Sequence, residues 1–185
     1  MLQTVLNTTK DKMEASLKSL QNELGKLRTG RASLAVLDGI RVDYYGTPTP
    51  INQVASLAVP EARLITVQPW ETNLIPAIEK AILEANLGLT PASDGKIVRL
   101  PIPKLTEERR KDIVKQVKGF GEEAKVGVRH VRKDAMDQIK KLKSDSKITE
   151  DEQKRGEKDV QKITDDYVAK VDGILVKKEE DIMTV

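Results

Sequence analysis

The side chains with the clearest chemistry are cationic, and they recur along one stretch of the chain. On a helical projection of residues 106–143, one flank carries Lys111, Lys118, Lys125, Arg129, Arg132, Lys140 and Lys143. Most carboxylates of this stretch fall on the other flank. Because a helix that needs only solubility more often mixes its signs, this basic flank is a candidate contact for nucleic-acid phosphates. The alternative is a solvated face on which cations cluster by chance, and the pattern alone leaves both interpretations open.

The same stretch carries the apolar spacing that a helix needs to hold those cations in place. Apolar or small residues recur at steps of three and four, at Ile113, Val117, Phe120, Ala124, Val128, Val131, Ala135, Ile139 and Leu142. This spacing predicts one long helix with a single buried stripe. At 1.5 Å per residue the helix would be about 57 Å long, which is too long for a compact globule.

Catalytic chemistry is not expected from this sequence. His130 is the single histidine, and Asp134, four residues later, makes it part of a surface pair. One histidine makes a weak metal site, and the sequence places no nucleophile beside it. The segment 119–124 matches G-x-G-x-x-A, but it lies inside a helical pattern with no strand before it, so it fails the condition for dinucleotide binding. We predict no enzyme activity, no cofactor and no metal.

Composition favours long helices over a thick core. Charged residues make up 33% of the 185 residues, aromatic residues 3%, and there is no cysteine. The net charge of +3 is uneven, since residues 106–144 hold twelve basic and seven acidic side chains while residues 145–185 hold eight and twelve. This distribution indicates a localised docking face. No signal peptide and no span of membrane-crossing length is recognisable, so we expect a soluble, cytoplasmic protein.

Two further amphipathic helices are predicted, over residues 2–27 and from residue 150 to about residue 182. Gly30 is the expected C-cap of the first helix, and Thr149 to Glu152 form a capping box for the last. Three such helices cannot each remain soluble alone, so they should pack as a bundle. Between them, residues 31–104 show short strand patterns around 40–44, 54–59, 64–67 and 96–100. A helix is expected near 74–85, capped by Thr72 or Asn73 and ended by Gly88, and a turn is expected at 46–50.

The expected fold class is therefore α+β with two domains. Residues 1–30 and 105–185 form an elongated three-helix bundle, and residues 31–104 form a small inserted α/β domain. Two short chain crossings join the domains, at residues 30–33 and 101–105. These crossings could act as a hinge or as a rigid, well-packed junction, and the sequence favours neither.

Several segments together resemble the bacterial ribosome recycling factor family. They are Leu27-Arg28-Thr29-Gly30-Arg31-Ala32-Ser33, Tyr44-Tyr45-Gly46-Thr47-Pro48-Thr49-Pro50, Glu79-Lys80-Ala81-Ile82, Leu87-Gly88-Leu89, Leu105-Thr106-Glu107-Glu108-Arg109-Arg110-Lys111 and Val128-Arg129-His130-Val131-Arg132-Lys133-Asp134-Ala135. The resemblance runs nearly end to end, with the segments in the family's order. It implies an L-shaped molecule of transfer-RNA-like dimensions, built from a three-helix bundle and an inserted α/β domain.

The resemblance also implies a function and its partners. Members of this family bind the post-termination ribosome and, with elongation factor G and GTP, split it into subunits, releasing messenger RNA and transfer RNA. The partner hydrolyses the GTP, and initiation factor three acts downstream. The bundle docks on ribosomal RNA of the large subunit, while the second domain swings. The factor is expected to be a monomer without a membrane partner.

Site residues follow from the resemblance and from the basic flank. The expected ribosomal-RNA-binding residues are Arg28, Arg31, Lys125, Arg129, Arg132 and Lys133. The expected hinge residues are Gly30, Arg31, Ala32, Ser33, Pro101, Pro103, Lys104 and Leu105. This sequence departs from the family pattern at Lys133, where relatives often have arginine, at His130, where asparagine is common, and at its terminal Met183-Thr184-Val185.

A second hypothesis comes from a different class of protein. A helical adaptor or chaperone cofactor would bind other proteins through its bundle. It would need an exposed apolar patch, and its affinity would be indifferent to salt.

Overall fold

The computed structural model describes residues 1–184, which divide into two compact units. Unit 1 comprises residues 1–27 and 108–183, and unit 2 comprises residues 28–107 together with residue 184. Val185, the last residue of the terminal tripeptide, lies outside the described residues. The mixture of long helices and a small sheet confirms the predicted α+β class.

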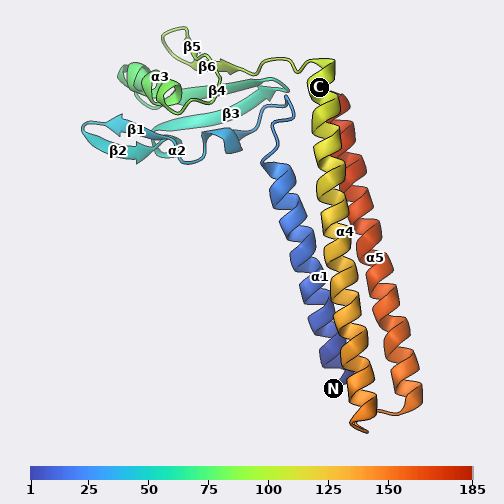
Figure 1. Cartoon of the computed structure of the whole chain (residues 1–185). Helices are drawn as coiled ribbons and strands as arrows, with labels where there is room; N and C mark the ends of the chain where they lie inside the picture. Colours follow the sequence, from blue (N-terminus) through green and yellow to red (C-terminus); the bar gives the residue numbers. More distant parts are fainter. Residues whose placement is uncertain (185) are drawn as a thin grey trace. The chain divides into compact units, whose positions relative to one another are not determined.

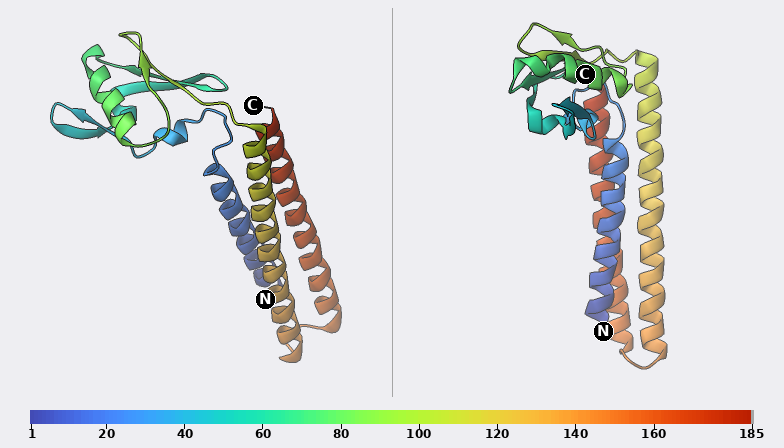
Figure 2. Two further views of the ribbon diagram at one scale, coloured as in Figure 1. Left: turned by 45° about the horizontal axis from the view of Figure 1, so that its top comes forward. Right: turned by 90° about the vertical axis from the view of Figure 1, so that its left-hand side faces the viewer.

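Unit 1 is built from three long helices that run side by side (Figure 1). They are α1 (Leu2–Gly25), α4 (Glu107–Ser144) and α5 (Glu150–Met183). Helix α4 runs antiparallel to the other two, and α1 and α5 approach each other most closely (Figure 2). Met13, Ile139 and Val160 are among the fully buried side chains that form the shared core. Each helix is thus held by its one apolar stripe, as periodicity predicts.

Gly121 of α4 marks a close approach between two helices. A Cβ atom placed on Gly121 would overlap the side chain of Leu175 on α5, whereas one on Gly119 would meet open space. Only the second of the two glycines is therefore required by packing. Phe120, Val131 and Leu142, which the sequence places in the buried stripe, are only partly buried. They lie at the edge of the stripe, where the partner helix does not cover the whole side chain.

The ends of the helices show one confirmed prediction and one error. At the start of α5, the backbone N–H of Thr149 donates to Glu152 Oε2 at 2.7 Å, and the N–H of Glu152 donates to Thr149 Oγ1 at 3.2 Å, which is the predicted capping box. The predicted C-cap of α1 at Gly30 is wrong. Helix α1 ends at Gly25, and Lys26 closes it in a right-handed conformation. The N–H of Lys26 donates to the carbonyl of Glu23, and the N–H of Leu27 donates to the carbonyl of Leu24.

Unit 2 contains two antiparallel sheets and one main helix. The two-stranded sheet is formed by β1 (Arg41–Tyr44) and β2 (Thr47–Pro50). The four-stranded sheet has the order β3-β4-β6-β5, from β3 (Ala55–Glu61), β4 (Leu64–Pro69), β6 (Val98–Pro101) and β5 (Ala92–Ser93). The helices are α2 (Ile51–Val54), α3 (Ile75–Glu84) and two 3₁₀ turns, η1 (Leu34–Leu37) and η2 (Thr72–Leu74).

The core of unit 2 is aliphatic. Ile78 and Ile82 of α3 are fully buried among side chains of β4 and β6, including Ile65, Val67 and Leu100. These residues alternate along each strand and recur at helical spacing along α3, so one face of each element points into the core. The core holds the loops of unit 2 at fixed positions.

Three local predictions for unit 2 are wrong. Residues 47–50 form strand β2 rather than a turn, because a two-stranded ribbon has free edges that tolerate Pro48 and Pro50. The turn lies at Tyr45 and Gly46, both with positive φ. Neither Thr72 nor Asn73 caps α3, because 3₁₀ turn η2 precedes it and Leu74 occupies the N-cap position. Helix α3 also ends earlier than Gly88, at Glu84.

Candidate nucleic-acid interface

The basic flank of α4 lies beside α5. Lys125 and Arg132 both reach side chains of α5, whereas the opposite flank of α4, with Phe120 and Glu123, faces α1. Residues of α5 therefore border the candidate phosphate site. The sequence of α4 alone gives no indication of this neighbour.

Arg132 is held in a short chain of hydrogen bonds. Its Nη1 donates to Oε1 of Gln161 at 3.0 Å, and Nε2 of Gln161 donates to Oδ1 of Asp165 at 2.8 Å. The Nε atom of Arg132 is buried and has no hydrogen-bond partner among the described residues. The guanidinium group is thus oriented through one nitrogen, and this leaves donors for a further ligand, since arginine carries five N–H groups.

Lys125 is engaged within the bundle. Its Nζ lies 2.6 Å from Asp172 Oδ1 and 3.9 Å from Glu122 Oε1, and its side chain is only 18% exposed. A phosphate at this position would have to compete with a formed ion pair. Of the six predicted RNA-binding residues, Lys125 is the one whose charge is most fully neutralised inside the protein.

Arg129 and Lys133 are exposed on α4 and form no ion pair or hydrogen bond with any other described residue. Arg129 lies three residues before Arg132 and Lys133 directly follows it. With Arg132, these residues provide adjacent cations on less than two turns of one helix. His130, on the other flank, is exposed, and its Nε2 lies 3.8 Å from Asp134 Oδ2, as the predicted surface pair requires.

The remaining two predicted RNA-binding residues belong to unit 2. Arg28 donates from Nη1 to the carbonyl oxygen of Leu87 at 2.8 Å, and Arg31 is exposed. Arg28 therefore fastens the first residues of unit 2 to the loop after α3. This local role was not foreseen from the sequence, because Leu87 is 59 residues away along the chain.

The predicted hinge residues make several contacts within unit 2. Gly30 has φ of +76° and a Cβ placed on it would lie 2.9 Å from Leu105 Cγ, so the two chain crossings pack against each other. The N–H of Ala32 donates to Ala62 O at 2.7 Å, and the N–H of Ile102 donates to Arg63 O at 2.8 Å. Both crossings are thereby bound to the same turn between β3 and β4.

The other predicted hinge residues differ in how they are held. Pro101 pairs with Leu64 as the last residue of β6, and the side chain of Ser33 accepts a hydrogen bond from the N–H of Ala35. Pro103 and Lys104 are exposed and lie outside any regular element. The core of unit 2 therefore restrains these two residues less than it restrains Gly30, Ala32 and Pro101.

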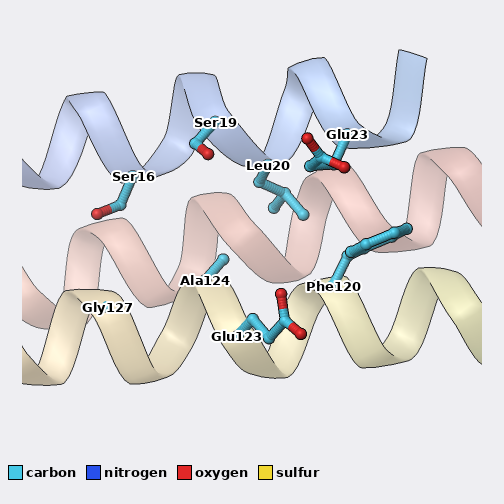
Figure 3. Close-up of a pocket in the computed structure, with 8 residues that line it drawn as sticks. All are labelled: Ser16, Ser19, Leu20, Glu23, Phe120, Glu123, Ala124 and Gly127. Carbon is cyan, nitrogen blue, oxygen red and sulfur yellow. The ribbon is translucent and has the colours of Figure 1, made fainter. Parts of the chain in front are cut away.

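A groove of about 250 Å³ lies between α1 and α4, away from the basic flank (Figure 3). It is lined by Ser16, Ser19, Leu20 and Glu23 of α1, and by Phe120, Glu123, Ala124 and Gly127 of α4. The lining contains no histidine and no cation, so it is not a phosphate site. Among the described residues, no His, Cys, Asp and Glu side chains are grouped as metal ligands, and no helix could span a membrane.

Three residues relevant to the interface were missed by sequence analysis, namely Gln161, Asp165 and Asp172 on α5. The available signal was the i,i+4 spacing of Gln161 and Asp165, which commonly forms a hydrogen-bonded pair. Finding their role also required knowing which flank of α5 faces α4, and this is set by packing.

Comparison with known proteins gives one consistent result. The family model described as "Ribosome recycling factor" matches residues 20–183. Curated ribosome-recycling factors of Oleidesulfovibrio alaskensis and Solidesulfovibrio magneticus are 55% and 53% identical over 184 residues, covering 100% of both chains in each case. One from a Geobacillus species is 51% identical over 185 residues, again covering 100% of both chains.

Solved structures agree with the sequence comparisons. A solution structure of a ribosome recycling factor, 40% identical, superposes with a TM-score of 0.76 and covers 100% of this chain and 98% of its own. A model of the T. thermophilus ribosome recycling factor, with E. coli elongation factor G bound to the E. coli post-termination complex, is 44% identical, with a TM-score of 0.64 and 98% coverage of both chains. Sequence, fold and the full-length match together place this chain in the ribosome recycling factor family.

Proposed function

We propose that this chain recycles ribosomes. It binds the post-termination ribosome and, with elongation factor G and GTP, splits it into subunits, so that messenger RNA and transfer RNA are released. The observation that carries this proposal is the 55% identity to a curated ribosome-recycling factor over the full length of both chains. A structure of a 44% identical relative, described with elongation factor G on a post-termination complex, supports the choice of partners.

The chain acts as a non-enzymatic factor. Hydrolysis of GTP belongs to elongation factor G, and initiation factor three acts after the subunits have separated. The factor works in the cytoplasm as a monomer. Its own contribution is binding and mechanical coupling, which require charged surface and two units rather than a catalytic group.

The docking face is proposed to lie on the basic flank of α4 and to bind ribosomal RNA of the large subunit. Arg129 and Lys133 supply exposed charges, and Arg132 supplies an oriented fork that suits a phosphate. Lys125 contributes less directly, because Asp172 holds it. Arg28 and Arg31 form a separate proposed RNA contact on unit 2.

The moving joint is proposed to lie at the borders of unit 2. Gly30 contacts Leu105, and Ala32 and Ile102 are hydrogen-bonded to the β3–β4 turn. Because both crossings are thus bound to unit 2, these contacts favour a joint that lies between the crossings and unit 1. The chain then bends near Leu27, the last residue of the first segment of unit 1, and near Glu107, directly before unit 1 resumes. Such a joint moves unit 2 as one body.

The test is sedimentation of purified post-termination ribosomes with the protein, elongation factor G and GTP. The expected result is separation into subunits that requires all three components. Wild-type protein that leaves the ribosomes intact would overturn the proposed function.

The joint is tested with introduced disulfides. Because the chain has no cysteine, pairs of cysteines can be introduced, one in each unit. A disulfide between units should preserve binding and block splitting, and reduction should restore it.

The docking face is tested with Arg132→Gly against Lys140→Gly, another cation of the basic flank that is exposed on α4. We expect Arg132→Gly to abolish binding to the large subunit while circular dichroism shows an intact bundle, and Lys140→Gly to bind more tightly than Arg132→Gly. Equal affinities of Arg132→Gly and wild-type protein would exclude Arg132 from the interface.

A further inference from the structure

Unit 2 displays aromatic side chains in a chain that has few of them. The sequence contains one tryptophan, three tyrosines and one phenylalanine. Trp70 is 67% exposed and Tyr45 is 70% exposed, although large aromatic side chains are mostly buried. Glu71 directly follows Trp70 in the chain and accepts a hydrogen bond from the hydroxyl of Tyr45. Tyr45, Trp70 and Glu71 are called the aromatic–carboxylate surface.

The backbone of Tyr45 is strained in order to present this ring. Tyr45 has φ of +49° at the first central position of the β1–β2 turn, where glycine, asparagine or aspartate is normally found. A left-handed conformation costs an ordinary L-residue about 1–2 kcal/mol. Strain of this kind that persists at an exposed position points to a functional requirement, because folding alone would favour another residue.

The ring of Tyr45 is nevertheless held in one orientation. Its hydroxyl donates to Glu71 Oε2 at 2.6 Å and accepts from Asn73 Nδ2 at 3.2 Å. Its ring meets the ring of Tyr44 edge to face, with centroids 4.8 Å apart. An exposed side chain that is already ordered loses little entropy when a partner binds, which is the property of a binding hot spot.

The carboxylate of Glu71 retains acceptor capacity. Its other oxygen, Oε1, accepts the hydroxyl of Tyr44 at 3.2 Å. A carboxylate has about four lone-pair sites, so two hydroxyls leave room for a further donor. The negative charge of Glu71 and the hydrogen bond to it raise the pKa of Tyr44, whose hydroxyl is already a donor at neutral pH.

The local charge distinguishes between two kinds of partner. Exposed aromatic rings can stack on nucleobases, but such sites are accompanied by cations that hold the phosphates. Strand β1, the turn after it and residues 69–74 contain two carboxylates, Asp43 and Glu71, against one cation, Arg41, so their net charge is negative. A nucleic-acid backbone is therefore repelled here. A cationic side chain is attracted both by the carboxylate and by the faces of the rings.

We infer that the aromatic–carboxylate surface docks a protein partner through an arginine or lysine side chain of that partner. This inference rests on the proposed function, because the partner is sought within the complex of ribosome and elongation factor G. It adds to that function a second, protein-directed contact on unit 2, in contrast to the RNA-directed flank of α4.

Point variants distinguish a role of the exposed rings in binding a partner from a role in the stability of unit 2. Tyr45→Asn removes the ring but suits the left-handed turn, so the midpoint of thermal unfolding should stay unchanged or rise. Subunit splitting should nevertheless slow about fivefold to thirtyfold, as for loss of a hot-spot residue. Trp70→Ala should behave likewise. Leu83→Ala is the matched control, because Leu83 is 57% exposed on α3 of the same unit and should split ribosomes at the wild-type rate.

The identity of the partner is tested by a photo-crosslinking amino acid, p-benzoylphenylalanine, in place of Tyr45. Full-length protein is irradiated on purified ribosomes with elongation factor G and GTP. We expect a protease-sensitive adduct whose mapped peptide contains lysine or arginine next to the attachment point. A nuclease-sensitive adduct, or no adduct from bound protein, would overturn the inference. If wild-type protein splits ribosomes and Tyr45→Asn does so equally well, the inference fails while the proposed function stands.

Discussion

Arg132 on α4 donates a hydrogen bond to Gln161 on α5, with 3.0 Å between Nη1 and Oε1. Gln161 in turn donates to Asp165, so an uncharged side chain stands between the guanidinium group and the nearest carboxylate of this chain of contacts. The arginine is thereby oriented without being neutralised. This arrangement differs from that of Lys125, which is bound directly by Asp172.

Replacing Gln161 should weaken ribosome binding although this residue lies outside the predicted site. We expect Gln161→Ala to lower affinity about fivefold, because one orienting hydrogen bond of about 1 kcal/mol is lost. Gln153→Ala is the control, since Gln153 makes the same kind of i,i+4 bond on α5, to Glu157, without an arginine. Filter binding to large subunits measures both. Equal affinities of the two variants would show that Gln161 does not position Arg132.

Arg129 and Lys125 should respond differently to truncation and to salt. Arg129→Ala removes an exposed cation, so the slope of log affinity against log salt should fall by about 0.7–0.9 with little change in stability. Lys125→Ala should change that slope less, because the charge already pairs with Asp172 at 2.6 Å. Titrations of large-subunit binding at several salt concentrations give both slopes. A larger change for Lys125→Ala than for Arg129→Ala would reverse the assignment.

Two glycines on α4 should give opposite effects when changed to alanine. Gly121→Ala places a Cβ against Leu175 and should destabilise the bundle by about 1–3 kcal/mol. Gly119→Ala places its Cβ in open space and should stabilise α4 by about 0.5–1 kcal/mol through helix propensity. Urea unfolding followed by circular dichroism compares the two. A neutral Gly121→Ala would mean that Leu175 moves aside without loss.

The stability of unit 1 should depend on the ionisation of Tyr167 at alkaline pH. Tyr167 is buried and donates to Glu14 Oε2 at 2.9 Å, and burial together with this hydrogen bond raises the pKa of its hydroxyl. Because the folded-state pKa lies above the unfolded value of about 10, the stabilisation is complete below pH 10 and is lost as pH rises through the folded pKa.

The corresponding measurement is urea unfolding of wild-type protein and Tyr167→Phe between pH 8 and strongly alkaline pH. Below pH 10, the free energy of unfolding of the variant should be about 1 kcal/mol lower than that of wild-type protein. Above pH 10, the free energy of unfolding should fall less with rising pH in the variant than in wild-type protein. Tyr44→Phe serves as a comparison, because Tyr44 belongs to unit 2. If Tyr167→Phe follows the wild-type curve, the hydrogen bond to Glu14 does not contribute to stability.

The long elements could be predicted from sequence, but their mutual orientation could not. The stripe from Ile113 to Ile139 predicts α4 because periodicity is a local property of the chain. The engagement of Lys125 by Asp172 depends on which flank of α4 meets α5, and that is decided by close packing such as Gly121 against Leu175. The sequence therefore nominates cations for the proposed interface but does not indicate which of them carries an uncompensated charge.

Short elements of unit 2 were predicted less well, for a related reason. Pro48 and Pro50 favour a turn by local preference, yet both lie in β2, because pairing with β1 is a tertiary contact that overrides it. The strained turn at Tyr45 is likewise invisible to propensity, since tyrosine is disfavoured where it stands. Of the site residues whose roles were missed, Gln161 and Asp172 act across elements, and Asp165 acts through Gln161.

The turn between β3 and β4 has a consequence for how this fold can be rebuilt. The carbonyls of Ala62 and Arg63 accept hydrogen bonds from the N–H groups of Ala32 and Ile102. The segment that enters unit 2 and the segment that leaves it are therefore held at two adjacent residues. The spacing of the two ends is thus encoded by residues 28–107 themselves. We therefore expect this segment to behave as a cassette that can be exchanged between homologues with its own junctions intact.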